Sequence, residues 1–384
     1  MANGDVPMSV RRLIVEVELE GLNVRRFCAE HGVSTWFFYA LRRRFAAEGA
    51  AGIEPRSRAP HRVANRTPDA VEDAIVVLRK ELLDAGLDAG AGTIWFHLHQ
   101  RDVAVVPSES TIWRVLSRRG FVVADASKAP RRAARSFAAA RANECWQTDD
   151  TAWSLADGTG VKIVNVIDDC TRVAIASHAA PQATASAVFG AFIAGAGEWG
   201  WPEWVLCDNA KAHRHGLTTA LNALGIRVGH SRPYHPQTCG KVERFHQTLQ
   251  RYLRAHDAAS SLTELQDHLD AFRDVYNHRR PHRALGRKIP AQVWNATPKS
   301  GPDPHQLDTP TQIHRVRVAA NGTLSAGRRW RITIGSAYAN TTADVIITAT
   351  RCHVFIDGHL ARQLTLDPTR RDHPLTERQA PRHV

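Results

Sequence analysis

A change of residue pattern at Cys145 constrains the fold of this chain more than any other feature. Three runs typical of antiparallel strands follow it, at 146–155, 162–168 and 172–178, and helices and strands then alternate. The expected later elements are a helix at 183–197, a strand at 203–207, a helix at 217–224, a strand at 226–230 and helices at about 240–256 and 262–278. This order predicts an α/β core over 144–298, with a mixed sheet flanked by helices.

Two helical units are expected ahead of this core, at 1–49 and 67–123. Each ends in two helices joined by a turn, which is a helix-turn-helix pattern, and Ser108 or Ser110 would cap the last helix of the second unit. A small helical bundle with a solvated charged face is the alternative for the first unit. If the units bind DNA, the residues expected near the major groove are Thr35, Tyr39, Arg42 and Arg43 in the first and Arg114 and Arg118 in the second.

The rest of the chain consists of connecting segments and a strand-rich region. The segments 50–66 and 124–143 are basic and lack apolar periodicity, so they are expected to be linkers. Residues 311–366 alternate with period two and contain the hairpin signals Asn321-Gly322 and Asp357-Gly358, which predict a small all-β barrel. The polar residues 367–384 are expected to form a flexible tail.

The charge of the chain favours a polyanionic partner. Lys and Arg number 50 against 38 for Asp and Glu, which gives a net charge of +12, and binding to DNA phosphates releases counterions. None of the 6 cysteines forms a C-x-x-C pair, so neither a zinc ribbon nor a redox motif is expected. No apolar run approaches the roughly 20 residues that span a bilayer, and the start lacks a signal-peptide pattern. We therefore expect a cytoplasmic, nucleoid-associated protein without a membrane partner.

Three acidic residues are candidates for metal-dependent chemistry. Asp149 lies in the middle of an expected strand, Asp208 directly follows another, and Glu243 lies early in a helix, turned away from its apolar stripe. Two-metal phosphoryl transfer needs converging carboxylates that hold two cations about 4 Å apart, and Mg²⁺ prefers carboxylate oxygen. Lys241 and Arg244 flank Glu243 and are expected to contact DNA. For Glu243, an ordinary solvated helix face is the alternative.

Five motifs occur in a fixed order along the core. They are W-Q-T-D-D-T (146–151), D-D-C-T-R (168–172), C-D-N (207–209), R-P-Y-H-P-Q-T-C-G-K-V-E-R-F-H (232–246) and Y-N-H-R-R-P-H-R-A-L (276–285). Together they resemble the catalytic core of insertion-sequence transposases related to retroviral integrases, and the spacing from Asp208 to Glu243 is close to the family's. The tandem helix-turn-helix pattern ahead of the core also resembles these transposases.

The resemblance implies a ribonuclease-H-like fold and a DDE transposase activity. Asp149, Asp208 and Glu243 match the catalytic residues that bind two Mg²⁺ or Mn²⁺ ions per active site. The implied enzyme is a polynucleotidyl transferase that binds the inverted terminal repeats of a mobile element in double-stranded DNA. It would cleave strands and transfer them to target DNA without a covalent protein–DNA intermediate, as a homo-oligomer assembled on paired ends.

Some residues depart from the family pattern or stay outside the ligand set. Ala210 stands where the family has Gly and Cys239 where it has Asn, and neither change removes an acid. Asp150 should point to the opposite face of the sheet, and Asp168 and Asp169 are expected to be turn residues. His278 and His282 have the spacing of a metal pair, but the intervening Pro281 favours a basic, DNA-facing or structural turn.

Two other functions remain open from the sequence. One is a DNA-binding regulator that keeps the fold without catalysis, although all three acids are present. The other is a ribonuclease-H-like nuclease without a joining step, although the paired helix-turn-helix patterns favour recognition of defined sites.

Overall fold

The computed structural model describes residues 6–56, 66–101, 103, 105–122, 138–207, 217–230, 240–302 and 311–375. The chain divides into two units, Met1–Arg66 and Thr67–Val384. Among the described residues, no helix combines the length and the apolar character needed to cross a membrane.

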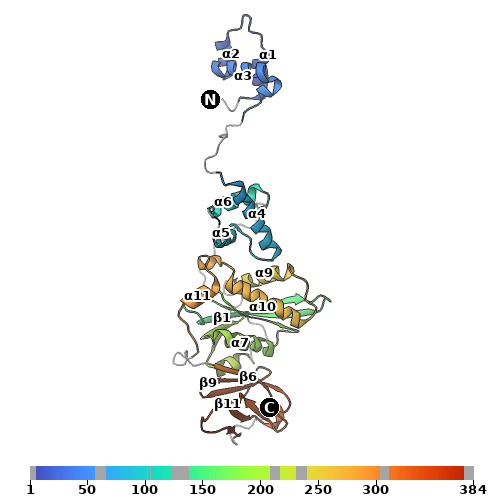
Figure 1. Ribbon diagram of the computed structural model, residues 1–384, viewed down its shortest axis with the longest axis vertical. Coiled ribbons are helices and arrows are strands. Elements are labelled where there is room, and N and C mark those ends of the chain that lie inside the picture. The colour runs from blue at the N-terminus through green and yellow to red at the C-terminus, as the bar shows by residue number, and fades with distance from the viewer. Residues whose placement is uncertain are drawn as a thin grey trace. The chain divides into compact units, whose positions relative to one another are not determined.

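The first unit is a three-helix bundle (Figure 1). Its helices are α1 (Met8–Glu16), α2 (Val24–Glu30) and α3 (Thr35–Glu48). Ser34 begins α3 by accepting a hydrogen bond from the backbone N–H of Phe37, which satisfies one of the donors left open at a helix start. The core contains Ile14, Phe27, Phe38 and Leu41.

The segment after α3 is more ordered than a linker. Residues Gly49–Ile53 form the 3-10 helix η1, and the Ile53 carbonyl accepts a hydrogen bond from Arg11 Nη1 at 3.1 Å. A Cβ at Gly52 would lie 2.6 Å from the backbone oxygen of Arg44, so only glycine allows this close return of the chain. The expected linker 50–66 therefore begins inside the packed unit, while residues 57–65 lie outside the described part.

A second three-helix bundle opens the unit Thr67–Val384. It contains α4 (Asp69–Asp84), α5 (Ala91–Gln100) and α6 (Glu109–Arg118), packed around Ile75, Leu78, Ile94, Ile112 and Leu116. Of the two expected caps for the last helix, Ser108 is the one used, since its side chain accepts from the N–H of Thr111. The expected linker 124–143 falls largely outside the described residues, so its extent stays a prediction.

A five-stranded mixed sheet forms the centre of the same unit. The strands lie in the order β3-β2-β1-β4-β5; β1–β2 and β2–β3 pair antiparallel, whereas β1–β4 and β4–β5 pair parallel. Their bounds are β1 (Cys145–Ser154), β2 (Gly160–Asp168), β3 (Ala174–Ala180), β4 (Trp204–Cys207) and β5 (Arg227–His230). The expected three antiparallel strands followed by strand–helix alternation are confirmed.

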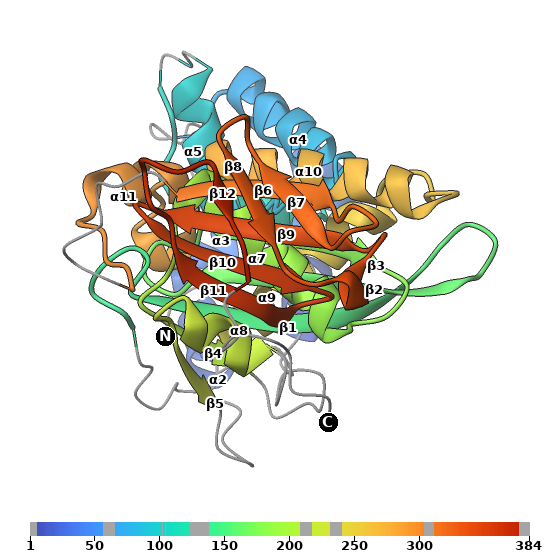
Figure 2. The same ribbon diagram turned by 90° about the horizontal axis from the view of Figure 1, so that it is seen from below.

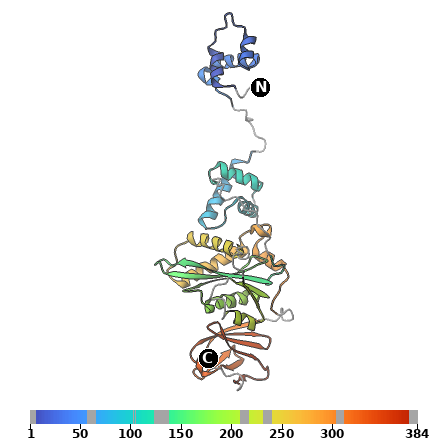
Figure 3. The ribbon, with the colours of Figure 1, turned by 180° about the vertical axis from the view of Figure 1, so that it is seen from behind.

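Helices cover both faces of this sheet (Figures 1 and 3). On one face α7 (Ala185–Trp199) packs Phe189 and Phe192 against Val164 and Val166. On the other, α9 (Gly240–Arg254) and α10 (Leu262–His278) pack Phe245 and Phe272 against Ile163 and Ile167. The shorter elements are α8 (Thr218–Ala223), η4 (Arg283–Leu285) and α11 (Pro290–Ala296). The apolar stripe of α9 thus decides which side of that helix stays polar.

The C-terminal region is all-β, as expected, and consists of two sheets around one apolar core (Figure 2). One has the order β11-β10-β9-β6 and the other β12-β8-β7. The strands are β6 (Thr311–Arg317), β7 (Thr323–Ala326), β8 (Trp330–Thr333), β9 (Thr342–Thr348), β10 (Arg351–Ile356), β11 (His359–Thr365) and β12 (Asp372–His373), with η6 (Ser336–Tyr338) between β8 and β9. The predicted hairpin at Asp357-Gly358 joins β10 to β11.

One contact joins this region to the core, and others hold its last strand in place. The Phe355 and Phe189 rings lie 4.6 Å apart between centroids, which joins β10 to α7 of the core. Arg362 Nη1 donates to the carbonyl of His373 at 2.9 Å, and β12 pairs with β8. The start of the expected flexible tail is therefore structured, and residues 376–384 lie outside the described part.

Candidate active site

Asp149 lies in the middle of β1, opposite Asn165 of β2. Its side chain is 28% exposed, and its Oδ1 accepts a hydrogen bond from the N–H of Asp150 at 2.9 Å. A carboxylate that is partly exposed offers oxygen donors to a cation. This edge of β1 is therefore a suitable place for a metal ligand.

A polar stripe of α9 runs beside β1. Gln250 Nε2 donates to Thr151 Oγ1 at 2.9 Å, and one turn earlier His246 Nδ1 lies 3.9 Å from Asp149 Oδ2. Glu243 is exposed and lies a further turn earlier, and spacings of three and four residues place all three on one side of a helix. The predicted apolar stripe of Val242, Phe245, Leu249, Tyr252 and Leu253 is buried as expected.

Asp208 lies outside the described residues. The strand before it is described, and Cys207, the last residue of β4, pairs in parallel register with Thr148 of β1. The end of β4 therefore lies beside the residue that precedes Asp149. Ala210 and Cys239 also fall outside the described part, so the effect of either residue on the site stays a prediction.

The carboxylates that are described suit a hard divalent cation. Asp149 and Glu243 offer oxygen donors only, which Mg²⁺ and Mn²⁺ accept, and the described residues contain no group of three or more His, Cys, Asp or Glu that could hold a metal. The third acid of the motif, Asp208, is not among those residues. The donor chemistry thus fits the expected ions.

His246 is a site residue that the sequence reading missed. Burial lowers the pKa of His246 to about 4, so the imidazole beside Asp149 is neutral at pH 7. Its Nε2 has no hydrogen-bond partner in the described part of the chain. Its position three residues after Glu243, which places both on the same side of the helix, could have identified it from the sequence. The 3.9 Å approach to Asp149 is therefore not an ion pair at neutral pH.

Asp168 is the last residue of β2 and Asp169 follows it, and both buried carboxylates belong to a network of hydrogen bonds. Asp168 Oδ1 accepts from the N–H and the hydroxyl of Thr171, both at 2.7 Å, which bears out its role in the turn. Burial raises the pKa of Asp168 to about 6, against these hydrogen bonds. Asp169 Oδ1 accepts from Gln147 Nε2 at 2.6 Å and pairs with Lys241 Nζ at 2.5 Å.

Lys241 takes part in this network. Its side chain is only 15% exposed, and Nζ points to Asp169 rather than to solvent. Burial lowers the pKa of Lys241, and the hydrogen bond to Asp169 opposes that shift. The expectation that Lys241 contacts DNA stays a prediction, and in this structure an internal carboxylate holds its ammonium group. Arg244, by contrast, is exposed on the same turn and contacts Gln247.

The expected DNA contacts of α3 divide into exposed and internal residues. Thr35, Tyr39 and Arg43 are exposed, and the neighbouring Trp36, which the sequence reading left out, is 72% exposed. Arg42 Nη1 instead donates to the carbonyls of Ile14 at 2.9 Å and Val17 at 2.7 Å. The DNA contact expected of Arg42 stays a prediction, and in this structure its guanidinium satisfies the open carbonyls at the end of α1.

On α6 the two expected contacts differ in the same way. Arg114 is exposed, as is Trp113 beside it. Arg118 pairs with the buried carboxylate of Glu72 on α4, and that pair, with Arg119, lowers the pKa of Glu72. The Arg118 side chain is nevertheless 59% exposed, so the ion pair leaves part of it accessible.

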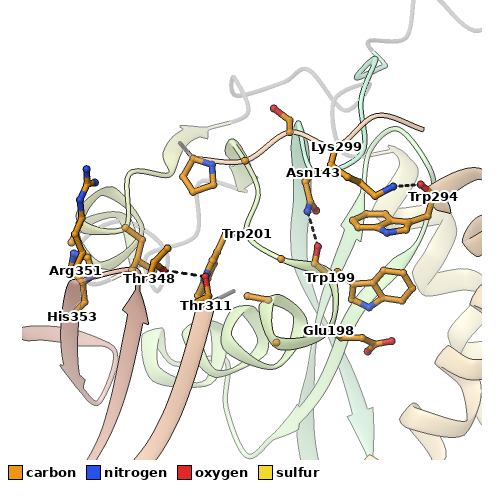
Figure 4. Close-up of a pocket in the computed structure, with 18 of the residues that line it drawn as sticks. Asn143, Glu198, Trp199, Trp201, Trp294, Lys299, Thr311, Thr348, Arg351 and His353 are labelled. Carbon is orange, nitrogen blue, oxygen red and sulfur yellow. Dashed lines mark hydrogen bonds between the residues drawn. The ribbon is translucent and has the colours of Figure 1, made fainter. Parts of the chain in front are cut away.

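A cavity of about 460 Å³ lies elsewhere, where the end of α7 and the segment 299–302 meet the all-β region (Figure 4). Asn143 Nδ2 donates to the Trp199 carbonyl there at 2.7 Å, and Lys299 Nζ lies 5.0 Å from the centre of the Trp294 ring. Neither Asp149 nor Glu243 lines this cavity. It is therefore separate from the candidate active site.

His278 and His282 do not form a metal pair. His278 is exposed and lies 3.2 Å from Asp274, whereas His282 is half-buried and its backbone N–H donates to the Lys288 carbonyl at 3.0 Å. Of the two roles that the sequence left for this turn, the structural one holds for His282.

Comparisons with known proteins find matching domain models and several similar solved structures. Models of the integrase core domain match residues 139–236 and 224–290, and a model of a homeodomain-like domain matches residues 37–116. Among solved structures, the magnesium complex of the HTLV-2 integrase catalytic core domain in its trimeric form is 18% identical, with a TM-score of 0.33, covering 41% of this chain and 99% of that one. The simian T-cell lymphotropic virus intasome in complex with PP2A regulatory subunit B56 gamma is 17% identical, with a TM-score of 0.39, covering 72% and 95%. The BIV integrase catalytic core domain is 20% identical, with a TM-score of 0.31, covering 40% and 95%.

The helical N-terminal region, the mixed sheet flanked by helices and the all-β C-terminal region together confirm the fold class expected from the sequence. The matched domains assign the central part to the polynucleotidyl transferase superfamily. The chain therefore contains a region similar to homeodomain-like domains, followed by a region similar to integrase core domains, which is the order that the sequence motifs predict for insertion-sequence DDE transposases.

Proposed function

We propose that this protein is a DNA transposase that binds the inverted terminal repeats of a mobile element and catalyses strand cleavage and strand transfer. The observation that carries the proposal is the meeting of the α9 polar stripe with β1. Gln250 contacts Thr151, His246 approaches Asp149, and Glu243 lies on the same side of the helix. The last residue of β4 lies beside Thr148, and Asp208 is the next residue of the sequence.

Asp149, Asp208 and Glu243 would hold two Mg²⁺ or Mn²⁺ ions. When bound, such ions supply activation of the attacking oxygen and stabilisation of the leaving oxygen in phosphoryl transfer. Arg244, exposed one residue after Glu243, would contact a phosphate of the DNA strand being cut.

Recognition of the element ends would fall to the N-terminal helices. Exposed polar, aromatic and basic residues on α3 suit base edges and phosphates, and Arg114 on α6 suits a second contact. Joining two ends in concert needs two active sites, and one chain supplies one. We therefore propose that at least two chains assemble on paired ends of double-stranded DNA.

Changing any one of the three acids to its amide should abolish cleavage and joining while DNA binding remains nearly unchanged. The variants are Asp149→Asn, Asp208→Asn and Glu243→Gln, tested on terminal-repeat DNA in Mg²⁺ with a gel assay for both steps. The reason is that the carboxylates bind metal, whereas basic side chains on other helices supply affinity.

The matched control is Asp150→Asn, which changes the neighbouring acid on β1. Asp150 pairs with Lys162 at 2.8 Å, and that variant should still cut. An amide variant at any of the three sites that cuts in Mg²⁺ would refute the assignment. Cleavage without joining by the unchanged chain would instead identify a nuclease, and end binding without cleavage would identify a regulator.

A further inference from the structure

The Asp169 carboxylate lies at the point where β1 and α9 come together. It is fully buried just after the end of β2, and its Oδ2 accepts from the N–H of Ala139 at 2.7 Å. Its Oδ1 accepts from Gln147 Nε2 at 2.6 Å and from Lys241 Nζ at 2.5 Å. One oxygen thus receives donors from two different elements, since Gln147 belongs to β1 and Lys241 to α9.

Both donors stand two residues before a proposed metal ligand. Gln147 precedes Asp149 on β1, and alternate residues of a strand share a face, so its side chain lies on the face that meets α9. Lys241 precedes Glu243 in the first turn of α9. The carboxylate of Asp169 therefore ties the strand that carries one ligand to the helix that carries another, close to both.

The energetics of this pair favour a geometric role. A buried ion pair recovers little or no net stability, because removing both charges from water costs about as much as their attraction returns. Directional hydrogen bonds from two elements to one oxygen nevertheless hold those elements at a set separation. Two metal ions about 4 Å apart need their carboxylates held to a fraction of an ångström.

We propose that Asp169 and Lys241 are positioning residues: through Gln147 and the start of α9, their ion pair sets the separation of Asp149 and Glu243, and thereby the affinity for divalent cations. This inference rests on the proposed function, because it concerns the same metal site. Neither residue touches the metal or the DNA in this role.

The test is Mn²⁺ binding to the full-length, DNA-free chain, followed by the loss of the electron paramagnetic resonance signal of the unbound ion. Lys241→Met should weaken Mn²⁺ binding about tenfold, as loss of a partner that orients a ligand commonly does. DNA binding and the melting temperature report folding in the same samples. Lys162→Met is the matched control, since it breaks the Lys162–Asp150 pair of the same sheet, at 2.8 Å, without touching α9, and it should bind Mn²⁺ like the unchanged chain.

A second variant guards against failure to fold. Asp169→Asn combined with Lys241→Met removes both charges. The new amide keeps one oxygen for the N–H of Ala139, and the Gln147 amide can turn so that its Oε1 accepts from the new NH2 group, so this variant should fold and still lose Mn²⁺ affinity. If a folded variant binds Mn²⁺ as tightly as Lys162→Met, the positioning role is wrong while the proposed function stands. If the unchanged chain itself binds no Mn²⁺ and cuts no DNA, the metal site fails and the positioning role fails with it.

Discussion

His246 and His282 show how burial decides the charge of single residues in this protein. Burial lowers the pKa of His282 to about 3, with Arg280 and Arg172 adding to the shift, and it lowers that of His246 to about 4. Both imidazoles are therefore neutral at pH 7. A histidine in a basic motif is thus not by itself a positive charge facing DNA.

His282 should make the protein less stable in mild acid. The unfolded chain takes up a proton on His282 near pH 6.5, whereas the folded chain resists it down to about pH 3. Its contribution to stability is complete above pH 6.5 and is lost as the pH falls from there toward 3. His282→Phe should flatten the decline of the melting temperature between pH 7 and pH 5. An unchanged slope in that variant would mean that His282 is exposed to protons in the folded state.

Adjacent arginines on α3 should differ in what they do. Arg42→Ala removes two hydrogen bonds to carbonyls at the end of α1 and should destabilise the first unit by about 2 kcal/mol. Arg43→Ala removes an exposed side chain and should leave stability nearly unchanged, but lower the slope of DNA affinity against salt by about one. Amide hydrogen exchange of α1 and α3 and binding at several salt concentrations check the two effects. Equal salt slopes for both variants would contradict this division.

At the scale of elements, periodicity predicted what depends on local sequence. The strands and helices of the core, the apolar stripe of α9 and the hairpin at Asp357-Gly358 all follow from spacing and turn residues. The roles of Arg42 and Lys241 could not follow from it, because their partners, at Ile14 and Asp169, are brought close only by the fold. The burial of His246 has the same origin, since it requires α9 to lie along β1.

Ion pairs join the second helical bundle (α4–α6) to the core. Asp88, between α4 and α5, accepts from Arg280 Nε at 2.8 Å and also pairs with Arg251 of α9. Glu109 at the start of α6 pairs with Arg287. A Cβ at Gly86 would lie 2.7 Å from the Cα of Tyr252, so the two surfaces meet backbone to backbone. This bundle is therefore docked on the core of its own chain.

Asp88→Ala should loosen this docking. It leaves the largely buried Arg280 and the exposed Arg251 without their shared carboxylate, which should cost on the order of 2 kcal/mol, between the values for exposed and buried pairs. Urea unfolding measures the loss, and faster proteolysis between α4 and α5 would accompany it. Asp73→Ala, which breaks an exposed pair with Arg119 at 3.0 Å, is the control and should be nearly neutral. Equal stability of the two variants would show that the Asp88 pairs do not hold the bundle.

At the scale of the whole molecule, the chain consists of two units. The first unit, Met1–Arg66, has its own core, whereas the second bundle belongs with the core and the all-β region. The basic residues 57–65 between the units were expected to be part of a linker. If chains assemble on paired ends, α3 is therefore the element that can bind one end while α6 and the active site of the same chain act on the other.

This arrangement predicts which defects a second chain can complement. Glu243→Gln chains, inactive but able to bind, are mixed with active chains carrying Tyr39→Ala and Arg43→Ala on α3. In a mixed dimer, the α3 of the first chain and the active site of the second then meet on one end, so joining should return. The same mixture with Arg114→Ala in place of the α3 changes should stay inactive, because α6 travels with the active site. Recovery with both partners, or with neither, would contradict the proposed crossing, and light scattering that finds one chain per pair of joined ends would refute the assembly altogether.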